Sequence, residues 1–516
     1  MKKLFLVTST LFAISGIIFT SCQKDKVGST SFTATLEECQ DDDGKTAFYN
    51  GTMRWVSGDK IKVFGTTGNG VYVASVHGGG DAVFTVESGD AGAAPYRAVY
   101  PATAANDDGT VELPVVQKTV DGSLTGFPMY AQGRSTNLDF KNLCGVLRMR
   151  MKKSGVSIIA IEVTGDIMVT GDYNVSYNNN RIPTLEYCCH GTKTTMMTCA
   201  TPQSIESQKD FYIFLPVHTY GEGMRIRIYS SDGKVCTKTV TAGHNVNIQR
   251  SKITTITLLN DNLTFVPDAG VLPGLFTIDA EGHQVRFSQG NLQYTTLGVW
   301  RFAPDQYKCI TFDNEFISNV YPKWIDLFGW GTGNNPTLAS TDYRDYSDFV
   351  DWGSNAIING GNVTNRWRTL TKDEWTYLFF TRSNTALGTT DNARYVKAKV
   401  NDVQGIILFP NGYNHPTDLS IPQYINNTSG SGWNANNYTL AQWSEMEAAG
   451  AVFFPVTGYR AGTECRNPNL YGMYWSSTPD VTRYSHCLSF ASHFIQTDNG
   501  YNCSYGFGVR PVLDNN

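Results

Sequence analysis

The first 260 residues of the chain form one short β-type run after another, and this pattern limits the possible fold more than any other feature. Ser31–Leu36, Asn142–Met151 and Arg225–Tyr229 alternate polar and apolar residues, which is typical of strands with one buried face. Phe211–Val217 is almost continuously apolar, as expected of a strand covered on both faces. Strands that recur every 8–12 residues or so predict β-sandwiches.

Two changes along the chain predict its division into parts. The break at Lys153-Ser154-Gly155 predicts two sandwiches, over residues 31–153 and 154–260. Residues 261–274 contain two prolines and two glycines and are predicted to be a linker. Only Trp55 precedes residue 270, whereas the other nine tryptophans follow it. The sequence therefore predicts a third domain of a different kind over residues 275–514.

The N-terminus has the features of an export signal. Lys2 and Lys3 precede an apolar stretch, Leu4–Phe19, which is too short to cross a bilayer as a helix. Thr20 and Ser21 are small residues directly before Cys22, as in bacterial lipoprotein signals. We expect residues 1–21 to be a signal peptide, Cys22 to carry the lipid and residues 22–30 to be a tether. The alternative is an ordinary signal peptide followed by an incidental cysteine; both place the chain outside the cytoplasm.

Composition and motifs exclude several classes of function. Charged residues make up 17% of the chain, the net charge is -5 and no basic block occurs, so we expect no nucleic-acid partner. The cysteines have no CxxC spacing, and the histidines form no HxxxH pair. We therefore predict no metal, no cofactor and no catalytic residue.

Four segments of the first half resemble one family. These segments are FTAT after Ser31, Lys45–Gly65 (KTAFYNGTMRWVSGDKIKVFG), Ala94–Ala102 (APYRAVYPA) and Leu138–Met151 (LDFKNLCGVLRMRM). They resemble the fimbrillin-like (Mfa-like) lipoproteins of Bacteroidales. The resemblance implies two all-β transthyretin-like sandwiches and a role in pilus assembly, in which an unpaired strand edge accepts a strand from a neighbouring subunit.

The same resemblance implies a processing site. In this family, proteolysis after an arginine can remove the first strand and open a groove. Arg54, directly before Trp55, is the nearest candidate in this sequence. The alternative is that Arg54 is a solvated turn residue beside a core tryptophan.

The second half contains two predicted helices and a second resemblance. Thr371–Arg382 and Thr439–Gly450 each begin with a capping box, with Glu374 and Gln442 as the third residue after the cap. The segments Trp367–Arg382 (WRTLTKDEWTYLFFTR), Gly472–Thr478 (GMYWSST) and Gly506–Val512 (GFGVRPV) resemble the formylglycine-generating-enzyme-like branch of the C-type lectin fold. Bacteroidales and Fibrobacter surface proteins share this domain. The resemblance implies an α+β C-type-lectin-like domain over residues 275–514.

The known activities of that fold are only partly matched. The oxidase chemistry of the enzyme branch uses two neighbouring cysteines, whereas Cys487 and Cys503 are sixteen residues apart. A structural disulfide between them, or two unpaired thiols, is favoured instead. A calcium-dependent lectin site needs several carboxylates, and the loop at Asn467-Pro468-Asn469 has only Glu464 nearby.

Calcium-free binding of a glycan or protein is better supported. Aromatic faces stack on sugar rings, and amides and carboxylates bind the hydroxyls. The candidate ligand-binding residues, all in aromatic and polar loops, are Trp330, Asp351, Trp352, Trp433, Asn434, Asn467, Asn469 and Trp475. The alternative is that most of these tryptophans hold a loop-rich domain together.

These predictions combine into one functional hypothesis. The chain is expected to be a lipid-anchored fimbrial subunit or an accessory or tip adhesin, exposed at the cell outer membrane, whose C-terminal domain binds a host or microbial glycan or protein. Its other expected partners are fimbrial subunits, through strand complementation, and the lipid of the outer membrane. The alternatives are a glycan-binding surface lipoprotein unrelated to pili and, less favoured, an oxidase of the formylglycine-generating type.

Overall fold

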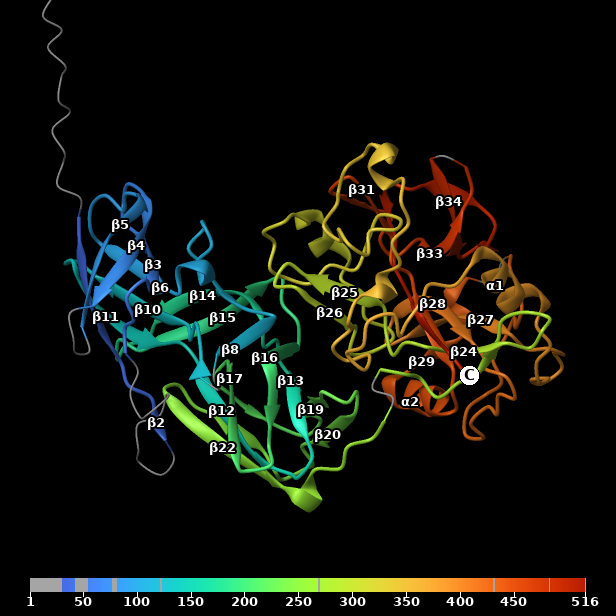
Figure 1. The fold of residues 1–516 in the computed structure, drawn as a ribbon, viewed down its shortest axis with the longest axis horizontal. Helices are drawn as coiled ribbons and strands as arrows, with labels where there is room; N and C mark the ends of the chain where they lie inside the picture. Colours follow the sequence, from blue (N-terminus) through green and yellow to red (C-terminus); the bar gives the residue numbers. More distant parts are fainter. Residues whose placement is uncertain are drawn as a thin grey trace, which may run out of the picture.

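The computed structural model describes residues 30–41, 54–76, 81–120, 123–267, 270–429, 432–481 and 483–515. The molecule is elongated, with a β-barrel at one end, a second β-body beside it and a loop-rich C-terminal half at the other end (Figure 1). The predicted signal peptide and Cys22 lie outside the described residues. Within the described residues, no helix is both long and apolar enough to cross a membrane.

Seven strands close the N-terminal barrel. In order around the barrel they are β1 (Phe32–Leu36), β11 (Asn137–Asn142), β10 (Met129–Gly133), β6 (Tyr96–Tyr100), β3 (Lys60–Phe64), β4 (Asn69–Val76) and β5 (Ala82–Gly89). Alternate residues point inward, so Ile61 and Val63 of β3 are fully buried while Lys60 is exposed. The alternation seen in the sequence therefore produces the barrel core.

The second β-body contains two main sheets. One consists of β17 (Lys209–Leu215), β12 (Gly145–Lys152), β22 (Lys252–Leu259) and β2 (Gln40–Asp41). The other consists of β20 (Val235–Thr239), β19 (Arg225–Ser230), β13 (Ser157–Thr164), β16 (Thr194–Ser204), β8 (Val116–Val120) and β9 (Ser123–Leu124). Ile213 of β17 packs into the core of this body, whereas Phe214 faces the core of the barrel. The apolar run is thus covered on both faces, as its sequence predicts.

Strand pairing crosses the division that the sequence predicts at residue 153. β12 runs between β17 and β22, and β8 pairs with β16. A further sheet joins β7 (Val111–Leu113) to β14 (Gly171–Tyr177) and β15 (Pro183–Cys189), and β18 (His218–Tyr220) pairs with β21 (Val246–Ile248). The turn at residues 153–155 therefore joins two strands of one body, β12 and β13, and is not a boundary between two independent sandwiches.

The C-terminal half combines short sheets with long loops. Its sheets are β23 (Phe276–Thr277), β24 (Gln284–Phe287) and β38 (Val512–Asp514); β25 (Leu292–Thr295) and β26 (Val299–Phe302); β29 (Asn437–Tyr438), β27 (Tyr395–Val400), β28 (Val403–Leu408) and β30 (Val452–Pro455); β32 (Glu464–Arg466), β31 (Tyr459–Ala461) and β37 (Tyr505–Gly506); and β33 (Gly472–Pro479), β34 (Tyr484–Ala491), β35 (Phe494–Gln496) and β36 (Gly500–Asn502).

Both predicted helix starts are confirmed. Thr371 caps α1 (Lys372–Thr376), which continues as the π-helical turn η6 (Tyr377–Thr381), and Thr439 caps α2 (Leu440–Ala448). Each cap forms the reciprocal capping box that the sequence predicts. The remaining short helices are η1 (Ala102–Ala104), η2 (Asn260–Asn262), η3 (Thr311–Phe316), η4 (Tyr343–Tyr346), η5 (Trp352–Ser354) and η7 (Trp433–Ala435).

The second β-body and the C-terminal half share a buried interface. Tyr229 packs in one cluster with Val299 and Trp324 of the C-terminal half. The guanidinium of Arg301 lies 3.9 Å from the ring centre of Trp324, and its Nη1 is 3.7 Å from Oε2 of the fully buried Glu162. These contacts hold the C-terminal half against the β-strands that precede it.

The predicted linker is also packed in its described residues. Val266 forms a β-bridge with Val235, and the N–H of Leu272 donates to the carbonyl of Phe287 over 2.9 Å. Residues 261–267 and 270–274 therefore have fixed partners on both sides of the interface, which a freely moving connection lacks.

Candidate functional site

β1 is the strand that completes the barrel, and it is well separated in the sequence from the next barrel strand, β3. It pairs in parallel with β11 and antiparallel with β5. Phe32 and Ala34 point inward and are fully buried, and the ring of Phe32 makes edge contacts with Tyr72 and Tyr96 at 4.9 and 5.0 Å. Removal of β1 would leave a slot between β5 and β11, with unpaired backbone groups on both sides and an apolar floor.

Arg54 and Trp55 lie between β2 and β3 in the chain. Arg54 is exposed, whereas Trp55 is 3% exposed and its indole N–H donates to the carbonyl of Ala34 over 3.1 Å. The Trp55 ring also makes edge contacts with Phe84 and Phe140 at 4.9 and 5.4 Å. A cut after Arg54 would therefore leave Trp55 in the barrel core and break the covalent connection between the barrel and the segment that carries β1.

Glu37, directly after β1, ties this strand to the second β-body. Arg250 donates from Nη2 to Oε1 of Glu37 over 3.0 Å, and its Nη1 contacts the other carboxylate oxygen. The N–H of Asn142 and the hydroxyl of Ser251 also donate to Oε2, over 2.9 and 3.0 Å. Burial opposes ionisation of Glu37, but these hydrogen bonds and the charge of Arg250 together hold its pKa below the usual value.

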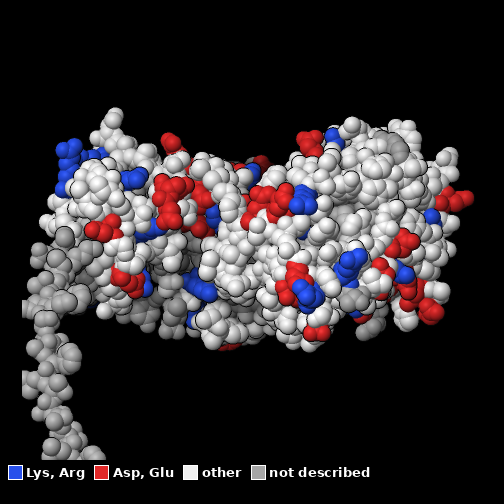
Figure 2. Space-filling model, turned by 90° about the horizontal axis from the view of Figure 1, so that it is seen from above, with Lys and Arg blue, Asp and Glu red and all other residues white. Residues whose placement is uncertain are grey.

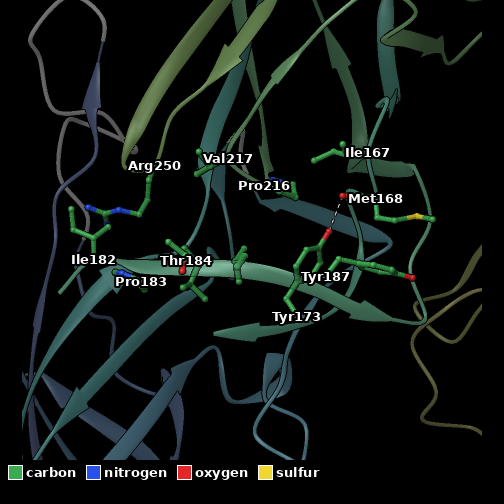
Figure 3. Close-up of a pocket in the computed structure, with 12 residues that line it drawn as sticks. Ile167, Met168, Tyr173, Ile182, Pro183, Thr184, Tyr187, Pro216, Val217 and Arg250 are labelled. Atoms are coloured by element: carbon green, nitrogen blue, oxygen red, sulfur yellow. Dashed lines mark hydrogen bonds between the residues drawn. The ribbon is translucent and has the colours of Figure 1, made fainter. Parts of the chain in front are cut away.

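An apolar groove of about 630 Å³ runs along β15, the edge strand of its sheet (Figure 3). Tyr187 and Val217 in its wall are 43% and 51% exposed, and Arg250 lies at one end. The lining residues of this β15 groove are Leu143, Ile167, Met168, Tyr173, Ile182, Pro183, Thr184, Leu185, Tyr187, Pro216, Val217 and Arg250. The groove thus combines a strand edge, an apolar floor and the cation that binds Glu37.

The structure buries the tryptophans that the sequence suggests as ligand-binding residues. Trp330, Trp352, Trp433 and Trp475 are exposed by 5%, 0%, 6% and 1%. The indole N–H of Trp330 donates to the carbonyl of Ser476 over 3.0 Å, and that of Trp475 to the carbonyl of Phe328 over 2.7 Å. Their faces pack on other core rings, which corrects the prediction that they stack on a ligand. Their burial fits the alternative, in which the tryptophans hold a loop-rich domain together.

The polar candidates do not converge on one site. Asp351 caps η5 by accepting from the N–H of Gly353, and its other oxygen accepts from the N–H of Thr369, each over 2.9 Å. Asn434 is exposed beside the buried Trp433. Asn467 and Asn469 adopt left-handed backbone conformations, with φ of 49° and 61°, which asparagine tolerates better than most residues. Asn467 lines a cavity whose wall includes four tyrosines.

Cys487 and Cys503 are two buried free thiols. Ser485 of β34 pairs with Tyr501 of β36, so Cys503 lies opposite Arg483, whose carbonyl accepts from its N–H over 3.1 Å. Arg483 is four residues before Cys487, which is about 13 Å along an extended strand. A disulfide needs Cα atoms within about 7 Å, so the register separates the two cysteines and corrects the suggested disulfide. Burial raises the pKa of both thiols.

One group of metal-ligand types occurs among the described residues, formed by Asp172, Cys189 and His190. Nζ of Lys323, from the C-terminal half, lies 2.8 Å from each carboxylate oxygen of Asp172. His190 Nδ1 is 2.8 Å from Oδ2 of the same carboxylate. Because Lys323 already neutralises Asp172, this group is better described as a polar contact between the two halves than as a metal site.

Charges on the face seen in Figure 2 lie in small groups of both signs with uncharged surface between them. Exposed pairs such as Lys60–Glu87 and Arg344–Asp342, each with a nitrogen–oxygen distance of 2.6 Å, bring charges of opposite sign together on the surface. Over the described residues of this face, there is no broad basic area of the kind that binds a nucleic-acid backbone.

No protein-family model and no curated protein sequence matches the chain. Several solved structures are similar to parts of it. A candidate cell adhesion protein of Bacteroides ovatus is 14% identical, with a TM-score of 0.30, over 46% of this chain and 94% of that protein. The tip fimbrial protein Mfa3 of Porphyromonas gingivalis, truncated at its C-terminus, is 12% identical, with a TM-score of 0.21, over 46% and 98%.

A fimbrial protein of Bacteroides ovatus is 9% identical, with a TM-score of 0.20, over 94% of this chain and 99% of that protein. These three structures are fimbrial and cell adhesion proteins of Bacteroides and Porphyromonas. All three TM-scores lie below 0.5, so these similarities do not by themselves establish a shared fold.

Proposed function

We propose that the chain is a surface-exposed fimbrial subunit, or an accessory adhesin of a fimbria, that joins its neighbours by strand complementation. The observation that carries this proposal is β1, a separate strand that closes the barrel beside the exposed Arg54. Backbone pairing is largely independent of side chains, so a strand of another subunit with a similar apolar pattern can occupy the same slot.

The contacts of β1 define what such a strand must carry. Phe32 and Ala34 fill the barrel core, and Glu37 binds Arg250. The incoming strand therefore needs a large and a small apolar residue two positions apart, and a carboxylate three positions after the small one. Arg250 also lies in the β15 groove, so a longer incoming segment can continue from the slot into this groove.

The proposal is tested by blocking the cut. Arg54→Gln should abolish detergent-resistant ladders on gels of unboiled surface material, because β1 then stays attached. Arg134→Gln is the matched control, since Arg134 is an exposed arginine in the turn between β10 and β11. Ladders that persist in Arg54→Gln and equal those of the control would rule out processing at this residue. A chain that stays monomeric even after β1 is cut away would rule out strand complementation.

The anchor is a second part of the proposal. Lipid attached to Cys22 would hold the chain on the outer membrane, with the C-terminal half directed toward the surroundings. Metabolic labelling with a fatty acid should tag the native chain and not Cys22→Ser. Equal labelling of both would exclude this anchor, and loss of label with unchanged ladders would separate anchoring from polymer formation.

A second candidate is a glycan-binding surface lipoprotein that does not polymerise. The cavity beside Asn467 favours it, because this cavity does not depend on β1. Sugar binding by a chain that forms no ladders would support this candidate over the fimbrial one. An oxidase of the formylglycine-generating type is disfavoured, because Cys487 and Cys503 do not form a neighbouring pair.

A further inference from the structure

A cavity of about 320 Å³ lies between two sheets of the C-terminal half. Tyr459 of β31 and Tyr505 of β37 come from one sheet, and Phe494 of β35 and Tyr501 of β36 from the other. The residues that line this tyrosine pocket are Tyr459, Asn467, Tyr471, Met473, Phe494, Gln496, Tyr501, Tyr505 and Phe507. Its size falls at the lower end of the range for small-ligand sites, which is about 300–1,000 Å³.

The aromatic floor of the tyrosine pocket is held in place by the core beneath it. Phe507 is fully buried and stacks on Trp475, with ring centres 4.1 Å apart. Tyr459, Tyr501 and Tyr505 surround it, with their ring centres 6.2, 5.6 and 6.3 Å from that of Phe507. A rigid aromatic floor of this kind loses little entropy when a flat ligand face packs against it.

The wall of the pocket offers neutral hydrogen-bonding groups. Across the residues that the structure describes, the hydroxyls of Tyr471 and Tyr505 and the side-chain amide of Asn467 make no hydrogen bond within the protein. A tyrosine hydroxyl can donate and accept, and an amide provides two donors and an acceptor. These groups therefore suit ligand hydroxyls, which also donate and accept.

The chemistry of the lining selects the class of ligand. None of the side chains that line the pocket is charged, so a phosphate or carboxylate would find no cation among them. The guanidinium of Arg466, which is hydrogen-bonded to Tyr459, is already paired with Glu464. A calcium ion would find no carboxylate. A purely apolar ligand would remove the tyrosine hydroxyls and the amide from water without replacing their hydrogen bonds.

We infer that the tyrosine pocket binds the ring of an uncharged pyranose sugar without a metal ion. The apolar C–H face of the ring packs on the aromatic floor, and its hydroxyls bond to Asn467, Tyr471 and Tyr505. This inference rests on the second candidate of the proposed function, glycan binding, and gives the class of sugar. It does not depend on strand complementation, because no residue of β1 lines the pocket. It also replaces the buried tryptophans with tyrosines as the residues that contact the ligand.

Titration calorimetry and ligand-observed NMR on the processed full chain test the inference. The probes are the methyl glycosides of glucose, galactose, mannose and N-acetylglucosamine, each with and without a chelator. At least one should bind saturably, with an affinity that the chelator does not change. Tyr505→Ala should weaken binding about tenfold or more, which is about 1.4 kcal/mol. Tyr343→Ala, in η4, is the matched control, because Tyr343 does not line the pocket, and it should bind as the unchanged chain does.

Two further variants guard against simple misfolding. Tyr505→Phe keeps the ring and removes the hydroxyl, and Asn467→Gly removes the amide at a left-handed position that glycine accepts. Each should weaken binding several-fold while the circular dichroism spectrum stays unchanged. Binding that is unaffected in all three pocket variants overturns the inference.

The remaining outcomes separate this inference from the fimbrial proposal. Ladders on gels with no binding of any probe overturn the pocket inference and leave the fimbrial proposal standing. Binding without ladders supports the pocket and contradicts the fimbrial proposal. Binding of N-acetylneuraminate alone, or binding that requires calcium, overturns the assignment of an uncharged ligand bound without metal.

Discussion

The N-terminal barrel and the C-terminal half satisfy their backbone polar groups in different ways. In the barrel, β1 is held on both sides by hydrogen bonds to neighbouring strands. In the C-terminal half, buried side chains bind loop carbonyls: Arg382 donates to the carbonyl of Phe409 over 2.7 Å, and Arg460 to that of Leu338 over 3.2 Å. Another strand can form the same backbone hydrogen bonds as β1. A loop that is held by particular side chains cannot be replaced in this way, because its hydrogen bonds depend on those side chains. We therefore expect exchange of a strand in the barrel and a fixed binding geometry in the C-terminal half.

The largest expected effect tests the fixed geometry of the C-terminal half. Trp475→Ala should destabilise this half by about 3–5 kcal/mol, because it opens a cavity beneath Phe507 and removes a buried hydrogen bond. Hydrogen exchange on the full chain should show lost protection in β33 and β34 and unchanged protection in β3 and β6. Equal loss in the barrel would mean that the two regions unfold as one unit and would weaken the contrast between them.

The next effect concerns the interface between the two halves and depends on pH. Glu112 is 8% exposed, and its burial, opposed by Lys323, raises its pKa to about 7. The folded chain therefore binds this proton more tightly than the unfolded chain does. The contribution of protonated Glu112 to the stability of the folded chain is fully present below about pH 4.5 and is lost as the pH rises through about 7.

Glu112→Gln removes this titration. At pH 8 the variant should be more stable than the unchanged chain by up to about 3 kcal/mol, and at pH 4 the difference should vanish. Denaturant unfolding at both pH values measures it. A difference that does not change with pH would show that Glu112 does not titrate in this range.

A smaller effect tests how β1 is retained. Once the chain is cut after Arg54, Glu37→Gln should speed the release of β1 about 10- to 100-fold, since hydrogen bonds to a charged group contribute about 1.5–3 kcal/mol. Release can be followed by mass spectrometry of the freed segment. Unchanged release would mean that the core contacts of Phe32 hold the strand without help from Arg250.

The smallest expected effect comes from an exposed ion pair in the barrel. Lys60→Ala removes the contact with Glu87, whose side chain is 40% exposed. Exposed pairs contribute about 0–1 kcal/mol, so the midpoint of unfolding should hardly move. A large loss of stability here would show that side-chain charges, and not strand pairing alone, hold the barrel together.

Local features of this fold could be predicted from the sequence. The alternation in Ser31–Leu36 and Arg225–Tyr229 predicts β1 and β19 to within one residue at each end, and both capping boxes mark the residue at which a helix starts. The short segment that contains the first box also holds an ion pair between Arg368 and Glu374, at 2.8 Å. Such features depend on neighbours within a few residues, and the sequence contains those neighbours.

Long-range features could not be predicted in the same way. The pairing of β8 with β16 joins residues about eighty positions apart, so the break at residue 153 suggested a boundary that strand pairing crosses. The tryptophans are poor markers of a surface, because the loops that cover them come from distant parts of the chain. Tyr459 and Tyr505 meet only because β31 pairs with β37. The tyrosines that recur between residues 459 and 505, on both sides of Asn467, were the available signal.

The contact of Arg301 with Glu162 and Trp324 has a mechanical consequence. If a surface-attached ligand pulls on the C-terminal half while the N-terminus is anchored, the tension must pass through this interface, because residues 261–267 and 270–274 are themselves packed and offer no slack. The molecule should then respond to flow as a stiff lever. The strength of ligand attachment would then depend on the direction of the force. A C-terminal half joined by a flexible hinge would show no such dependence.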